Sequence, residues 1–310
     1  PSNANMAKGV KIKDIRSLPI HIGEHGEIRS ASRLNKGEHV FLIHSTDVKD
    51  ELLRLFKVLY TLRKKGLIVD VLMPSFSYSR QHKAYPIEKH GPEALSGNSA
   101  RAIIKTLSHF SRNVYVANVH FSKTIGTVDI VNAFRRKGAE VAFEINNLNE
   151  LSALINITNL NLFDRLVKYF LREQKLGRQD VMVIAADKGA DIFAQDAAMH
   201  SGVAYGGHMD KTRDPSKAAE LQTQMVAPRI DIKGKAVILV DDMIDSGGTI
   251  IDASLLLRAI AANKVFVGAV YGIFSKGTSI FNDRQVIEEK IDQYLSRYNK
   301  IILKIVNKFL

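Results

Sequence analysis

Short β-branched apolar runs alternate with amphipathic helical patterns along most of this chain, and that alternation constrains its fold more than any other feature. The runs predict strands that are apolar almost throughout, which is typical of parallel sheets covered by helices on both faces. They are His39–His44, Leu67–Met73, Val114–Val119, Val141–Phe143, Val181–Ala186, Ala236–Val240 and Lys264–Val270. Helical periodicity is found between them, at Asp50–Lys64, Asn98–Leu107, Val128–Lys137, Asp191–Ser201 and Gly248–Ala262. The pattern predicts an α/β protein built of parallel layers.

The middle of the chain suggests where it divides. At 310 residues the chain is long enough for two ordinary domains. Two helical patterns, Leu148–Ile155 and Leu162–Glu173, separate halves of similar alternating character. We therefore expect two doubly wound parallel-sheet domains, an N-terminal half over residues 6–147 and a C-terminal half over residues 148–310.

Composition excludes several classes of protein. The chain has no cysteine, so it has no disulfide scaffold, thiol nucleophile or thiolate metal site, and a reducing cytoplasm suits it. No apolar run approaches the roughly 20 residues that span a bilayer, so we expect no membrane partner. The net charge of +12 comes from scattered Lys and Arg without interleaved aromatics. That distribution argues against a nucleic-acid partner, but a basic surface also attracts phosphorylated metabolites, so the charge alone separates these two classes of partner poorly.

The segment Val237–Thr249 carries the clearest chemistry. An apolar strand ends in Asp241 and Asp242, passes through a turn of small residues that includes Asp245, and enters a helix. Such a loop lies at the carboxyl edge of a parallel sheet, where open α/β sheets bind ligands. The turn residues Ser246, Gly247, Gly248 and Thr249 suit a phosphate group, because glycine lets backbone N–H groups approach and hydroxyls donate. The two aspartates suit the vicinal hydroxyls of a ribose or a hydrated Mg²⁺.

This segment resembles the phosphoribosyl-binding signature shared by phosphoribosyltransferases and ribose-phosphate diphosphokinases (PRPP synthetases). Further stretches in the same order resemble the diphosphokinases, and together they cover roughly Gly23 to Gly277. They are His44-Ser45-Thr46 with Asp50–Leu53, Met73–Gln81 with its Ser-Arg-Gln loop, Ala186–Gly189, Asp210–Arg213 and Ile273–Ser275. The resemblance implies two domains of phosphoribosyltransferase type and a Mg²⁺-dependent transfer of pyrophosphate from ATP to ribose 5-phosphate, giving PRPP and AMP.

The resemblance also implies roles for particular residues. Lys211 and Arg213, on a charged loop, would close over the transferring phosphates, and His120 at a strand end would act in catalysis and near the metal. Asp187 would face the ribose or the metal. The loop Asp241–Thr249, through Asp241, Asp242, Asp245, Ser246, Gly247, Gly248 and Thr249, would bind the ribose phosphate. ATP would contact Arg80, Gln81, His82 and, from a neighbouring subunit, Glu27. ATP sites of the family span subunits, so a homo-oligomer, a dimer or a hexamer, is expected.

Several positions depart from the family pattern. The segment Gly23–Glu27 lacks the adenine-stacking aromatic, and His82 replaces an acid. Asn118 replaces an aspartate two residues before His120, which removes a potential metal ligand, and Lys188 adds a charge after Asp187. These departures fall on the ATP and anomeric ends of the expected site.

Two alternatives therefore stay open. ADP-ribose also carries a ribosyl 5-phosphate with an anomeric hydroxyl, and Lys188 and the long central connection favour an acceptor with extra phosphate charge. A non-catalytic homologue that regulates a true synthetase is the other alternative, although the retained Lys211, Arg213 and His120 argue against it. Ribose 5-phosphate is the preferred acceptor, because the loop Ser246–Thr249 is complete.

Overall fold

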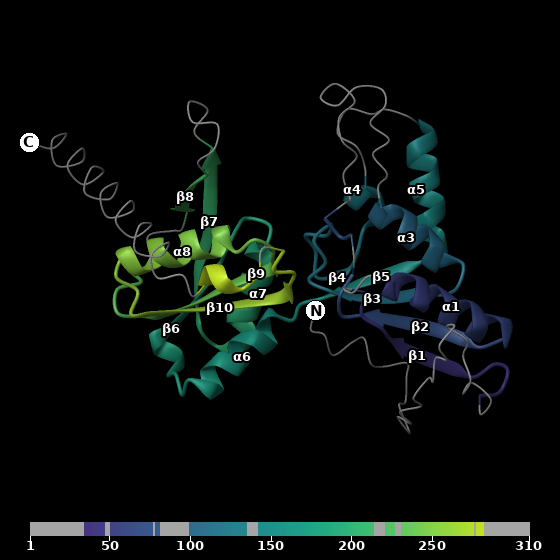
Figure 1. Ribbon diagram of the computed structural model, residues 1–310, viewed down its shortest axis with the longest axis horizontal. Coiled ribbons are helices and arrows are strands. Elements are labelled where there is room, and N and C mark those ends of the chain that lie inside the picture. Colours follow the sequence, from purple (N-terminus) through teal and green to yellow (C-terminus); the bar gives the residue numbers. More distant parts are fainter. Residues whose placement is uncertain are drawn as a thin grey trace, which may run out of the picture.

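The computed structural model describes residues 34–46, 50–76, 78–80, 99–134, 142–213, 221–226, 231–275 and 277–281. In these residues the chain forms two lobes, each built on a five-stranded sheet (Figure 1). The strand order is β1-β2-β3-β5-β4 in the first sheet and β10-β9-β6-β7-β8 in the second. This arrangement of two mainly parallel sheets with helices confirms the predicted α/β fold class.

The first sheet contains the N-terminal strands. Strands β1 (His39–Ile43), β2 (Ile68–Met73), β3 (Asn113–Ala117) and β5 (Asn156–Leu160) pair in parallel, and the short β4 (Gly126–Thr127) adds an antiparallel edge to β5. The helices of this lobe are α1 (Glu51–Lys64), α3 (Ser99–Ser108), α4 (Ile130–Phe134) and α5 (Ala142–Leu154). A single core joins Leu55 and Leu59 of α1 and Ile104 of α3 to Val71 and Val114 of the strands. Alternate strand residues thus bury one face of the sheet under the helices.

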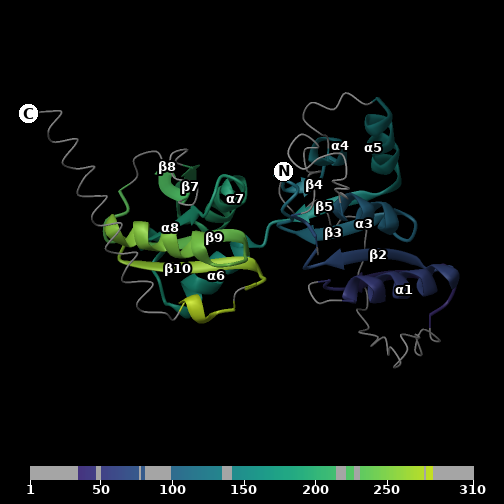
Figure 2. The same cartoon turned by 45° about the horizontal axis from the view of Figure 1, so that its top comes forward.

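The second sheet is covered on both faces. Its strands are β6 (Val181–Ala185), β7 (Ala204–Arg213), β8 (Leu221–Val226), β9 (Ala236–Ile244) and β10 (Lys264–Gly272), of which β7 and β8 pair antiparallel and the others in parallel. Helices α6 (Phe163–Glu173) and α7 (Asp191–Ser201) pack on one face through a core that includes Phe163, Ala197 and Ile238. Helix α8 (Gly248–Ala259) packs on the other through Leu257 and Leu239 (Figure 2). This lobe has the predicted doubly wound form.

The division between the sheets differs from the predicted one. The segment Asn156–Leu160, which the prediction placed in the C-terminal half, is β5 and pairs with β3 of the first sheet. The second lobe therefore begins after Leu160, with α6. The expected strand Val141–Phe143 is also wrong, because Ala142 and Phe143 begin α5. A short apolar run gives no periodicity that separates a strand from a helix start.

The carboxyl ends of the central strands of both sheets carry the segments that the sequence analysis selected. His120 follows β3, Asp187 follows β6, and Asp241 and Asp242 lie near the carboxyl end of β9. Within the described residues, no helix combines the length and apolar character needed to cross a bilayer.

Candidate functional site

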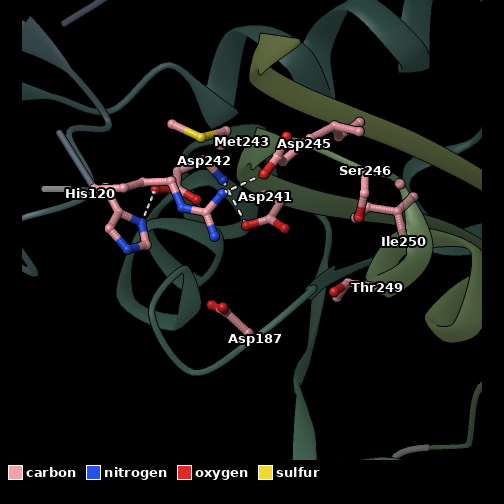
Figure 3. A pocket seen from close by; sticks show the side chains of 12 residues that line it. His120, Asp187, Asp241, Asp242, Met243, Asp245, Ser246, Thr249 and Ile250 are labelled. Carbon is pink, nitrogen blue, oxygen red and sulfur yellow. Dashed lines mark hydrogen bonds and ion pairs between the residues drawn. The ribbon is translucent and has the colours of Figure 1, made fainter. Parts of the chain in front are cut away.

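A cavity of about 140 Å³ lies where the two lobes meet, at the carboxyl ends of β9 and β6 (Figure 3). Both lobes line it, because Arg80 and His120 come from the first lobe and the other lining residues come from the second. Those others are Asp187, Asp241, Asp242, Met243, Ile244, Asp245, Ser246, Gly247, Thr249 and Ile250. Seven of these ten were predicted site residues: Asp187 and every predicted residue of the Asp241–Thr249 loop except Gly248.

Strand β9 delivers its two aspartates to this cavity. The strand is buried from Ala236 to Asp241, and the Asp241 side chain accepts a hydrogen bond from the Asp242 backbone N–H at 2.9 Å. Asp241 is only 6% exposed, while Asp242 is partly exposed. The burial of the preceding strand therefore fixes the position of both carboxylates.

The turn after β9 depends on Gly247. Its φ of 83° lies in the left-handed region that favours glycine, and helix α8 begins at the next residue. A Cβ on Gly247 would lie 2.6 Å from Cζ of Phe281, so the aromatic ring closes the back of the turn. The backbone N–H groups at the start of α8 have no earlier helical turn to bond, which makes this end of the helix suited to an anion.

This requirement for glycine gives a prediction with an internal control. Replacing Gly247 with Ala should lower the free energy of unfolding by about 1–3 kcal/mol, because the new methyl group meets strain and the Phe281 ring together. Replacing Gly248 should cost much less, since nothing lies within 4 Å of a Cβ there and its φ is not positive. Denaturant unfolding of the two variants measures the difference, and equal losses would contradict the assignment.

Asp187 enters the cavity from the neighbouring strand. Strands β6 and β9 are paired, so the turn after β6 lies beside Asp241 and Asp242, and the carboxylate of Asp187 points toward the same space (Figure 3). One oxygen of Asp187 accepts backbone N–H bonds from Gly189 at 2.8 Å and Ala190 at 3.1 Å. These bonds hold the carboxylate in place at the start of α7.

Two ion pairs join the lobes across the cavity. Arg80 Nη1 lies 2.8 Å from Asp245 Oδ2, and His120 Nδ1 lies 2.7 Å from Asp242 Oδ2. A carboxylate only accepts, so His120 donates Nδ1–H to Asp242, and in a neutral ring Nε2 is then the nitrogen that accepts. The pairs unite residues 165 and 122 positions apart in the chain. A third link is the hydroxyl of Tyr271 in β10, which donates to the carbonyl oxygen of Ala117.

The charge of the cavity indicates that a phosphate would bind there together with cations. Four aspartates line it, against one arginine and one histidine. A phosphorylated ligand would meet an excess of negative charge unless cations accompanied it. Mg²⁺ fits this donor set, because it is bound by one or two carboxylates together with water and substrate phosphates. Among the described residues, no three His, Asp or Glu side chains gather closely enough to hold a metal ion by themselves.

Several other predicted site residues are not among those that line the cavity. Lys211 and Arg213 are not on a loop: their backbone lies in β7, where they pair with Thr223 and Leu221 of β8. Gln81, His82 and Glu27 lie outside the described residues. Asn118, interpreted as a lost metal ligand, is 1% exposed and does not line the cavity.

Sequence reasoning missed a polar cluster behind the Asp187 turn. Asp191, in the first turn of α7, accepts hydrogen bonds from the Tyr205 hydroxyl and from His208 Nδ1, the latter at 2.9 Å. Burial, and then the bond to Asp191 and its charge, raises the pKa of Tyr205 above its usual value. The cluster ties β7, which carries Lys211 and Arg213, to the helix that follows Asp187. No sequence signal links these three positions.

Comparison with known proteins agrees with this geometry. Residues 156–308 match the pattern of the phosphoribosyl transferase domain. The chain is 31% identical over 247 residues to the ribose-phosphate pyrophosphokinase of Pyrococcus furiosus, a match covering 79% of this chain and 74% of that one. It is 28% identical over 247 residues to the enzyme of the same name from Thermococcus kodakarensis, covering 79% and 74%. The phosphoribosylpyrophosphate synthetase of Mycobacterium smegmatis shares the fold, with a TM-score of 0.53 and 21% identity over 82% of this chain and 72% of that chain. The chain therefore belongs to the ribose-phosphate pyrophosphokinase family.

Proposed function

We propose that this protein transfers the β,γ-diphosphoryl group of ATP to the anomeric hydroxyl of ribose 5-phosphate, giving PRPP and AMP. The observation that carries the proposal is a cavity that both lobes line. In it, the strand-end aspartates and the turn before α8 face Arg80 and His120 of the first lobe. Its relatives that bear the name ribose-phosphate pyrophosphokinase support the same reaction.

We assign the acceptor sugar to the second lobe. The phosphate of ribose 5-phosphate would lie on the turn Ser246–Thr249, where the backbone N–H groups of α8 and two hydroxyls can donate to it. Asp241 and Asp242 would accept from the ribose hydroxyls, which orients the anomeric carbon toward the first lobe. The left-handed backbone at Gly247 supports this role, because it brings main-chain groups close to the ligand.

We assign the donor nucleotide to the face contributed by the first lobe. Arg80, together with Gln81 and His82, would bind the phosphates and base of ATP. Arg80 now pairs with Asp245, so its guanidinium already lies beside the sugar-phosphate turn. Transfer would need the anomeric oxygen in line with the β-phosphorus, and the placement of both substrates in one cavity supports that geometry.

A divalent cation belongs to this scheme, with Asp187, Asp241 and Asp242 as the carboxylates that suit it. When bound, Mg²⁺ neutralises phosphate charge and polarises the phosphoryl oxygens. The excess of carboxylates in the cavity supports its involvement.

The chain's own residues would then move the proton and stabilise the developing charge. The anomeric oxygen forms a bond to the β-phosphorus, and the bond from that phosphorus to the bridging oxygen breaks, so AMP leaves with that oxygen. The hydroxyl proton goes to His120 Nε2, while Asp242 holds Nδ1 and stabilises the charged ring. Lys211 and Arg213, carried by β7, would stabilise the charge on the transferring phosphates.

The acceptor can be tested directly. Release of AMP from ATP with Mg²⁺ should be at least about tenfold faster, as kcat/KM, with ribose 5-phosphate than with ADP-ribose. ADP-ribose has a phosphate of lower charge at the turn and a bulky adenosine to accommodate. Mass spectrometry of the products identifies the group transferred. A higher kcat/KM with ADP-ribose would overturn the choice of acceptor, and absence of AMP with both would support the regulatory alternative.

Two further predictions remain part of this proposal. The N-terminal lobe would bind ATP and the C-terminal lobe phosphoribose, with the division after Leu160 rather than at residue 148. A homo-oligomer, in which Gly23–Glu27 of one copy approaches the Arg80 region of another, also stays a prediction, because Gly23–Glu27 lies outside the described residues.

A further inference from the structure

Four consecutive residues, Ala117–His120, lie at the end of β3, where the first lobe meets the second. The carbonyl of Ala117 accepts from Tyr271, the Val119 N–H donates to Asn159 Oδ1 at 3.0 Å, and His120 pairs with Asp242. Between them lies Asn118, whose φ of 40° is left-handed, a conformation that Asn tolerates better than most residues. Each residue of this segment therefore has its own partner.

The side chain of Asn118 fills a defined position in a buried amide network. Its Oδ1 accepts from the backbone N–H of Leu162 at 2.7 Å, and its Nδ2 donates to Asn161 Oδ1 at 3.1 Å. Leu162 and Asn161 form the connection between β5 and α6, where the chain passes from one lobe to the other. Asn118 and Asn161 are 1% and 9% exposed, so water has little access to either amide.

The roles of donor and acceptor in this network are fixed by backbone groups. Asn161 Oδ1 also accepts from the Phe163 N–H at 3.0 Å, and a backbone N–H can only donate. Asn161 Nδ2 donates to the Phe193 carbonyl at 2.8 Å and to Asp196 Oδ2 at 2.9 Å, both on α7. Position 118 must therefore accept from Leu162 and donate to Asn161 at the same time. An amide does both, whereas a carboxylate would place a charged oxygen against Asn161 Oδ1.

We propose that Asn118 is a positioning residue that locks His120 against Asp242 by joining the end of β3 to the interlobe connection through Asn161. This inference rests on the proposed function, in which His120 acts on the transferred group. The asparagine at this position, where the family pattern has an aspartate, is then a requirement of the lobe junction in this chain. The substitution supplies the donor that Asn161 needs.

The test replaces Asn118 with Asp, which keeps the size and the left-handed preference and changes only the donor. Burial and the facing oxygen of Asn161 raise the pKa of the new carboxyl, because both disfavour its charged form. When protonated, that carboxyl can donate to Asn161 and accept from Leu162, as the amide does. The stability of the variant should therefore be nearest to wild type at low pH and be lost as the pH rises through the raised pKa.

The direction of this pH dependence sets the expected results. At about pH 8 the melting temperature of N118D should be lower than wild type by several degrees and kcat lower by about tenfold. Both differences should narrow as the pH falls to about 5.5. The titratable groups in contact with this segment and its amide network are His120, which pairs with Asp242, Asp196 of α7, which pairs with His200, and Tyr271 of β10. They are present in both proteins, so the ratio of variant to wild type at each pH removes their contribution.

Two further variants complete the test. Asn118→Gly removes the amide without backbone strain, and its losses of kcat and stability should show no such pH dependence. Asn263→Asp, at an exposed Asn directly before β10 and away from the carboxyl ends of the strands, is the matched control and should behave like wild type.

A double-mutant cycle distinguishes positioning from support of the fold. In a His120→Ala background, N118D or N118G should cause no further loss of kcat, although each still lowers the melting temperature. Losses of kcat that simply multiply, or N118D with wild-type kcat at about pH 8, would overturn the proposal. If His120→Ala itself retains full kcat while ribose 5-phosphate still turns over, the proposed role of His120 fails. The pH-dependent stability of N118D then still tests the amide junction.

Discussion

Replacement of Asp242 with Ala is expected to reduce kcat/KM for ribose 5-phosphate by about 10³-fold or more. The change removes the proposed acceptor for the ribose hydroxyls and the partner that holds Nδ1 of His120. Positioned proton-transfer groups of this kind contribute about 10²–10⁴-fold. The loss should appear mainly in kcat, measured as AMP release at saturating ATP. Asp242→Asn retains an acceptor oxygen for Nδ1–H, so it should keep more activity than Asp242→Ala.

The fold should survive this change. Asp242 lies at the end of β9 with its side chain 21% exposed, and it contributes no apolar surface to either core. Its melting temperature should stay within a few degrees of wild type. Asp180, an exposed carboxylate before the start of β6 at the opposite end of the sheet, is the matched control, and Asp180→Ala should retain full activity. Full activity in Asp242→Ala would remove the basis for the acceptor site.

Replacing Lys211 or Arg213 with Ala should lower kcat by about 10³-fold while KM for either substrate changes little. Charge stabilisation of a transferring phosphoryl group by one cationic side chain is worth about 10³–10⁵-fold in related chemistry. Because such an interaction strengthens as charge develops, kcat and kcat/KM should fall together. Strand β7 pairs with β6 as far as Ala185 and His208, and both residues follow on β7 beyond that pairing.

A different result would contradict this role in charge stabilisation. A rise in KM with unchanged kcat would make Lys211 and Arg213 ordinary phosphate ligands. Lys264→Ala is the control, since Lys264 is exposed at the start of β10 and far along that strand from the cavity end. It carries the same charge and should leave both constants at their wild-type values.

The sequence predicted most of the parallel framework, because most of those strands show as continuous apolar runs. Strand β6 is buried at every residue from Val181 to Ala185, and its prediction was confirmed to within one residue. Strand β5 was missed, since Asn156, Thr158 and Asn159 interrupt its hydrophobic pattern and Asn has low strand propensity. Strands β7 and β8 were also missed, because glycine and charged residues interrupt the apolar pattern of β7 and two glutamines interrupt that of β8.

The site was predictable where it is local and not where it is formed by distant segments. The run from Asp241 to Thr249 contains its own strand end, turn and helix start, so its residues could be selected together. The pairs Arg80–Asp245 and His120–Asp242 depend on how two lobes dock, which no local pattern records. For the same reason Asn118 was interpreted as a lost ligand, because its partners Asn161 and Leu162 lie more than 40 positions away in the sequence.

The four carboxylates make the charge of the cavity negative, although the charge of the whole molecule is positive. The whole chain carries a net charge of +12, so at long range it attracts anionic metabolites from solution. At the cavity, however, such a molecule meets a negative electrostatic potential. A bare nucleotide would be drawn to the protein and then repelled, whereas the same nucleotide neutralised by a divalent cation would be admitted. The chain would thus combine fast capture with selection for the metal-loaded form of its substrate, and the supply of that cation would limit its turnover as directly as the supply of the sugar.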